Sequence, residues 1–140
     1  MNRYRLEDLV EGQTEQFTVT VTEEMQEQFF RMTGDSNPLH RDGAFAAAQG
    51  YSDRVVYGML TASLISTMAG VYLPGEYCLL MEVLSKFSHP VFPGDILTVS
   101  GQVAEIDRVF QTIDVKTRIM NGQGVSVYRG RYRAGFLKQE

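Results

Sequence analysis

The chain has 140 residues, enough for one domain with its own core but short for two. Hydrophobic residues make up 44% and charged residues 21% of it, which is typical of a folded globular protein and excludes a disordered one. The formal net charge of −4 argues against a nucleic-acid partner, because no basic patch is visible along the sequence. We therefore expect a single domain over residues 1–140.

The first half of the chain predicts one strand followed by helices. In chain order, we predict a strand over 15–21, a helix over 22–34, a short helix over 43–49 and a helix from Gly58 to about Tyr72. Thr22 and Asp42 are candidate N-caps, and Gly34 and Gly50 are helix stops.

The second half of the chain predicts a set of long strands. Four stretches are rich in β-branched or aromatic residues, namely 77–92, 95–106, 109–120 and 124–137. Asn121-Gly122 indicates a hairpin between the last two. The locally basic run 128–133 alternates with aromatic and small residues, which is better explained by a half-exposed strand than by a binding motif. Helices and strands kept apart favour an α+β fold, with an antiparallel sheet packed on helix.

Two features bear on the cellular location. The N-terminal residues lack the apolar run of a signal peptide, so we expect a cytoplasmic protein. Residues 55–75 carry no charge and are nearly long enough to span a bilayer. Because this stretch contains several Gly, Ser and Thr residues, we expect a helix buried in the protein core and no membrane partner. A second subunit could cover the part of this helix that the rest of the chain leaves exposed.

Residues 33–40 read TGDSNPLH and carry the main candidate site. Pro38 disfavours helical conformation at Asn37, so we expect a stiff loop rather than regular helix. Such a loop can aim Asp35 and His40 at one point, where an acid orients an imidazole and the two can hold and deprotonate a water. Read from the spacing alone, Asp35 could equally cap a turn and His40 be a surface residue. No third ligand is spaced near them, so we expect no metal.

Two further reactive residues have simpler explanations. Cys78 is the only cysteine, so it forms no intrachain disulfide, and its apolar surroundings predict a buried, inert thiol. His89 precedes Pro90 at a strand end, which predicts a role in a loop.

Residues 34–40 (GDSNPLH), followed by 56–60 (VYGML), resemble the MaoC-like family of R-specific enoyl-CoA hydratases, which have the hot-dog fold. Residues 90–99 (PVFPGDILTV) resemble a later turn and strand of that family, and the resemblance extends over roughly 15–137. It implies an antiparallel sheet wrapped around a long central helix. It also implies a homodimer or dimer of dimers with acyl-thioester tunnels at the subunit interface, and no cofactor.

The resemblance also assigns roles to residues. It implies that Asp35 and His40 are a catalytic pair, which positions a water that adds to C3 of a trans-2-enoyl thioester while C2 receives a proton. The backbone N–H of Gly58 would bind the thioester carbonyl oxygen. Asn37 would hold the loop, and Ser66, two turns after Gly58, could donate a hydrogen bond to Asp35.

One departure from the family and several alternatives remain open. The family commonly has histidine where this chain has Tyr57, which we expect to alter the pocket mouth and the acyl preference. Met59, Met68 and Met81 could line an acyl tunnel or be plain core. The carrier of the thioester could be CoA or acyl carrier protein. Rival functions are a hot-dog thioesterase, which attacks C1, and a non-catalytic acyl-thioester binding protein, which would need no Asp–His pair.

Overall fold

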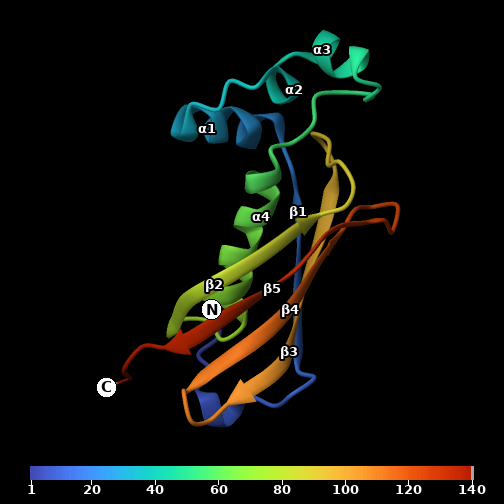
Figure 1. Ribbon diagram of the computed structural model, residues 1–140. Helices are drawn as coiled ribbons and strands as arrows, with labels where there is room; N and C mark the ends of the chain where they lie inside the picture. The colour runs from blue at the N-terminus through green and yellow to red at the C-terminus, as the bar shows by residue number, and fades with distance from the viewer. Residues whose placement is uncertain (140) are drawn as a thin grey trace.

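The computed structural model describes residues 1–139 (Figure 1). In chain order its elements are η1 (Leu6–Asp8), β1 (Thr14–Thr20), α1 (Glu23–Thr33), α2 (Pro38–Arg41), α3 (Gly43–Ala48), α4 (Gly58–Thr67), η2 (Met68–Tyr72), β2 (Cys78–Phe87), β3 (Ile96–Asp107), β4 (Thr112–Met120) and β5 (Ser126–Phe136). The five strands and the helices expected from the sequence are all present, and strands and helices are kept apart. The α+β class is therefore confirmed.

The strands form one antiparallel sheet in the order β1-β3-β4-β5-β2, so β1 and β2 are its edges. Two predicted strands were too long. The stretch 77–92 leaves the sheet after Phe87, shortly before Pro90, because proline cannot donate to a ladder. The stretch 109–120 becomes a strand only at Thr112, because an Asp107 carboxylate oxygen accepts from the N–H groups of Val109 and Phe110, both at 2.9 Å, and closes a turn there.

The core lies between the inner face of the sheet and α4, which the sheet wraps (Figure 1). Alternation in the strands decides which side chains point inward. From β4, Ile113, Val115 and Ile119 are buried, whereas Lys116 and Arg118 are exposed on the other face. The strand β4 thus has one buried and one exposed face.

The central helix begins at Gly58, as expected, and is α-helical to Thr67. It then continues to Tyr72 as a wider π-helical turn, which completes the predicted range. Its buried side packs on the sheet. Its other side is open in the single chain, where Met59 is 66% exposed. No helix within residues 1–139 is long and apolar enough to cross a membrane.

The hairpin expected at Asn121-Gly122 joins β4 to β5 through a loop longer than two residues. The N–H of Asn121 donates to the carbonyl oxygen of Val125 at 2.9 Å, and its side-chain oxygen accepts from the N–H groups of Gln123 and Val125. Gly124, at φ +76°, adopts the left-handed conformation that the turn requires.

We predict that Gly130→Ala destabilises the fold. A Cβ at Gly130 would lie 2.1 Å from the carbonyl oxygen of Leu84 on β2, and neither backbone can yield without breaking the ladder. We expect the free energy of unfolding in urea to fall by about 2–3 kcal/mol. Gly43→Ala is the control, because nothing lies within 4 Å of its Cβ position. Equal stability of the two variants would contradict this packing.

Candidate active site

The segment from Gly34 to Tyr57 crosses above the N-terminal end of α4 and carries most of the candidate residues (Figure 1). It starts where α1 ends. Gly34 has φ +71°, and its N–H donates to the carbonyl oxygen of Phe30 at 2.7 Å, which is the usual glycine C-cap. The chain therefore leaves α1 at a defined angle, and Asp35 is the first residue beyond the cap.

The expectation that residues 33–40 exclude regular helix was wrong for the last part of the segment. Pro38 begins α2, a single helical turn that carries His40. Proline is tolerated there because the N–H that it lacks would have no helical partner at this position. Asn37 is the N-cap, since its side-chain oxygen accepts from the N–H of Leu39 at 3.0 Å. This contact fits the prediction that Asn37 holds the segment.

The ring of His40 is oriented by the backbone. Its Nδ1 lies 2.7 Å from the carbonyl oxygen of Val55. Because a carbonyl only accepts, Nδ1 carries the hydrogen and the neutral ring keeps Nε2 as an acceptor. We had expected Asp35 to orient the ring. Among the hydrogen bonds of residues 1–139, none joins these two side chains, and the Asp35 carboxylate instead accepts from the N–H of Asn37 at 3.1 Å.

Tyr57 connects the two candidate catalytic residues. Its hydroxyl donates to the backbone carbonyl of Asp35 at 2.5 Å, and its ring lies 4.2 Å from the His40 ring between centroids. Tyr57 is 1% exposed, so it packs inside the domain, and its effect on the pocket mouth and the acyl preference stays a prediction. Burial raises the pKa of the Tyr57 phenol, and the Asp35 charge raises it further. The hydroxyl therefore remains a donor at neutral pH.

Gln26 on α1 holds this arrangement through its side-chain amide, and the sequence analysis did not single it out. It is 1% exposed. Its side-chain oxygen accepts from the N–H of Tyr57 at 3.0 Å, and its amide nitrogen donates to the carbonyl oxygens of His40 at 3.3 Å and Val55 at 3.2 Å. One amide thus ties α1 to α2 and to the residues that enter α4. Its position in an amphipathic helix, on the side that also carries Phe29 and Phe30, was the only available signal.

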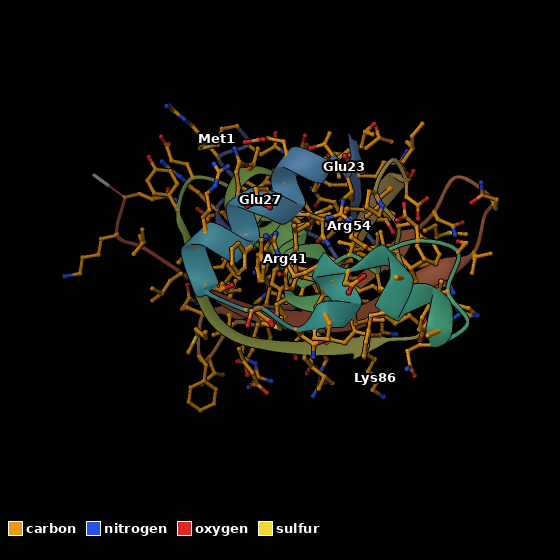
Figure 2. The ribbon with its side chains drawn as sticks, turned by 90° about the horizontal axis from the view of Figure 1, so that it is seen from above. Met1, Glu23, Glu27, Arg41, Arg54 and Lys86 are labelled. Carbon is orange, nitrogen blue, oxygen red and sulfur yellow. The ribbon has the colours of Figure 1, made fainter. Side chains whose placement is uncertain are left out.

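Ion pairs at the surface add to this connection. Arg41 on α2 contacts Glu27 on α1 at 2.5 Å and lies over the ring of Phe30 at 3.8 Å (Figure 2). Arg54 reaches Glu23 at 3.3 Å. The hydrogen bond from Arg41 lowers the pKa of the Glu27 carboxyl, so the pair persists at neutral pH.

Gly58 is the first residue of α4, directly after Tyr57. Backbone N–H groups in a first helical turn have no partner within the helix, and the helix dipole favours negative charge there. The ring of Phe87 on β2 lies 3.4 Å from where a Cβ of residue 58 would be, which is an ordinary van der Waals contact, so a side chain there would fill space that the glycine leaves open. Ser66 is exposed on α4. Its contact with Asp35 stays a prediction.

The remaining reactive residues lie outside this cluster. Cys78 is partly buried, where a fully buried thiol was predicted, and burial raises the pKa of its thiol to about 11, so the thiol stays protonated at neutral pH. His89 lies in the loop after β2, where its ring contacts the carbonyl oxygen of Ser126 at 3.1 Å, as its predicted loop role requires. Met68 is buried core, whereas Met59 and Met81 are more than half exposed.

An antiparallel sheet wrapped around one helix, with an acid, an imidazole and a helix N-terminus at one end, defines a hot-dog domain. The protein-family model of the MaoC-like domain matches residues 8–123 of the sequence, and the chain belongs to this family. The R-hydratase of Pseudomonas aeruginosa, in its unliganded form, superposes with a TM-score of 0.89 at 30% identity, over 96% of this chain and 86% of that one.

Three relatives of known name are similar in sequence. A 3-hydroxybutyryl-CoA dehydratase of Methylorubrum extorquens is 37% identical over 71% of this chain, which spans 64% of that protein. An (R)-specific enoyl-CoA hydratase of Aeromonas caviae is 35% identical over 73% of this chain and 76% of its own length. A mitochondrial 3-hydroxyacyl-[acyl-carrier-protein] dehydratase of Solanum lycopersicum is 32% identical over 58% of this chain and 48% of that protein.

We predict that Gln26→Leu destabilises the protein although leucine has a similar size. The substitution leaves the buried N–H of Tyr57 without a partner, which should reduce the free energy of unfolding by about 1–3 kcal/mol in urea denaturation. Gln28→Leu on the exposed side of α1 is the matched control and should change it by less than about 0.5 kcal/mol. A Gln26 variant as stable as this control would show that the amide is dispensable.

Proposed function

We propose that this chain catalyses the reversible hydration of trans-2-enoyl thioesters to R-3-hydroxyacyl thioesters. The observation that carries the proposal is the placement of Asp35 and His40 on one segment, fixed by Tyr57 and Gln26 above the first turn of α4. The names of the relatives from Methylorubrum extorquens and Aeromonas caviae support the same reaction.

The geometry suits the activation of one water. With its hydrogen on Nδ1, neutral His40 offers Nε2 as a base, and the Asp35 carboxylate offers further acceptor positions. In the hydration direction, the water oxygen bonds to C3 as the C2–C3 π bond breaks, one of the water protons passes to the pair, and the pair delivers a proton to C2. Dehydration follows the same steps in reverse.

Gly58 is suited to bind the thioester carbonyl oxygen. As C3 is attacked, negative charge develops on this oxygen, and an unpaired N–H at a helix N-terminus stabilises such a charge. One well-placed donor of this kind contributes about 3 kcal/mol. Because residue 58 has no side chain, the thioester can approach the backbone closely.

The active enzyme is a homodimer formed through β2. Among the described residues this edge strand pairs only with β5, and the exposed apolar side chains assigned to the dimer are Leu79, Leu80, Met81, Val83 and Phe87, whereas Leu84 lies with Lys86 on the outer face. An apolar, unpaired edge is a template for pairing with a second strand. Because Asp35 and Met59 are also exposed in the single chain, a second copy against β2 and α4 would enclose the site and form the acyl tunnel.

We predict that Asp35→Asn and His40→Ala each lower kcat with crotonyl-CoA by about 100-fold or more, because the pair activates the water. Loss of the enoyl-thioester absorbance reports hydration, and free thiol measured in the same samples reports hydrolysis. His89→Ala is the control and should keep wild-type activity, because His89 lies in a loop outside the cluster.

The same assay separates the rival functions. Thiol release would identify a thioesterase, and no reaction with any enoyl thioester would favour a binding protein. Hydration that yields the S-3-hydroxyacyl product in chiral analysis would contradict the proposed stereochemistry.

We predict that Val83→Asp converts the dimer to a monomer. A carboxylate at this position, 44% exposed on β2, would be buried without a partner if a second strand paired there. Molar mass by light scattering after size exclusion should fall by half, with the circular dichroism unchanged. Val109→Asp makes the same change at a hairpin tip that is 87% exposed, and should leave the mass as in wild type. A wild-type molar mass equal to that of a monomer would contradict the proposed dimer.

A further inference from the structure

Five cations gather on the outer face of the sheet, opposite the face that packs on α4. They come from three adjacent strands: Lys86 on β2, Lys116 and Arg118 on β4, and Arg129 and Arg131 on β5. All are exposed. We call these five residues the basic face. The chain has 13 Lys and Arg against 17 Asp and Glu, so such a concentration does not reflect a general excess of cations.

The register places these like charges directly opposite one another. Arg129 pairs with both Lys86 and Arg118, and Arg131 pairs with Lys116. Like charges at such positions destabilise a sheet. Among residues 1–139, no carboxylate lies within ion-pair distance of any of the five, although Arg133 further along β5 is paired with Asp114 at 2.8 Å. The arrangement thus disfavours the isolated chain and suits an anionic partner.

The basic face borders a groove of about 890 Å³ that crosses the sheet. Arg118, Arg129 and Lys86 line one side, and Lys116 and Arg131 line the other, at spacings of roughly 5 Å between strands and 7 Å along them. Leu84, 45% exposed, adds an apolar contact beside the cations. No aromatic side chain lines the groove among the described residues, so it lacks the stacking platform that single-stranded nucleic acids use.

We propose that the basic face is the docking surface for an acidic acyl carrier protein that presents the enoyl thioester. The inference rests on the proposed function and names the partner of the same site. An acidic helix with one apolar side chain complements cations arranged around Leu84, and complementary charge of this kind sets association and specificity. The relative from Solanum lycopersicum is named for the acyl-carrier-protein form of the reaction, whereas those from Methylorubrum extorquens and Aeromonas caviae are named for CoA. The choice of partner therefore rests on the charge of the basic face.

Lys86 is the member of the basic face that lies nearest to the catalytic end of the helix. Lys86 projects outward from β2, away from α4 (Figure 2). Its neighbour Phe87 points inward and comes within 3.4 Å of the Cβ position of Gly58. A carrier docked outside would therefore sit behind the strand end that borders the oxyanion donor, and its phosphopantetheine arm would reach the site around that end.

The test is a double charge reversal, Arg118→Glu with Arg131→Glu, in the full chain. The variant should fold, because each new carboxylate faces a cation, Arg129 or Lys116, and replaces a repulsive pair by an attractive one. The matched control is Arg108→Glu with Lys138→Glu, which makes the same change of net charge at exposed positions away from the groove. Thermal unfolding of both variants checks the fold.

Hydration is measured with crotonyl-acyl carrier protein and with crotonyl-CoA. We expect the reversal to raise KM for the protein-bound substrate by about tenfold or more, with kcat unchanged, and to leave kcat/KM for crotonyl-CoA within about twofold. The control variant should match wild type on both substrates. An unchanged KM for the protein-bound substrate, or wild type that hydrates crotonyl-CoA but not crotonyl-acyl carrier protein, would overturn the proposal and leave the proposed function intact.

Calorimetric titration with the holo carrier protein tests docking without catalysis. Binding that weakens with added salt and is lost in the reversal variant would support the docking proposal. It would do so even if neither substrate reacts, because absence of reaction refutes only the proposed function. Absence of binding to wild type would overturn it. Binding of a single-stranded RNA oligonucleotide through the same two arginines, with no carrier bound, would also overturn it and assign the surface to nucleic acid.

Discussion

The buried amide of Gln26 is the contact on which the functional end of this molecule depends. Its three hydrogen bonds reach α2, the residues after α3 and the N-cap of α4. The segment that carries Asp35 and His40 has little core of its own, since Ala46 is its only buried residue before Val56. Without apolar burial, its position must be set by directional polar contacts, and a buried amide with every group paired fixes a unique arrangement.

Tyr57 extends this constraint to the chemistry. Its N–H is held by Gln26, its hydroxyl holds the backbone of Asp35, and its ring packs on His40. Because the next residue is Gly58, one dipeptide connects the acid, the imidazole and the first N–H of α4. The aromatic residue before the glycine therefore acts on the geometry of the site, whereas the sequence had suggested an effect on the pocket mouth. A phenol is long enough to reach the Asp35 carbonyl while its ring stays buried.

Local patterns predicted the fold well and the site only in part. Period-two alternation located the strands, and Asp42 was correctly chosen as the N-cap of α3, because both signals act within a few residues. The contacts of Gln26 with Tyr57 and of Asp35 with Tyr57 join residues 31 and 22 positions apart, and no local pattern encodes them. The run 128–133 was noticed as locally basic and interpreted as a half-exposed strand. Only the register brings Lys116, Arg118 and Lys86 from two other strands opposite its arginines, so the sequence did not show the whole basic face.

The alternation that hides the basic face in the sequence also fixes its place in the structure. Tyr132 lies between Arg131 and Arg133 on β5 and points inward, where its hydroxyl donates to the carbonyl oxygen of Leu73 at 2.5 Å, directly after the helical segment of α4 and η2. Burial raises the pKa of this phenol, so the bond keeps its proton at neutral pH. The strand that displays the outer cations is therefore locked to the end of the same helical segment that begins at Gly58. A partner on the basic face would therefore bind a strand that this hydrogen bond ties to the helical segment.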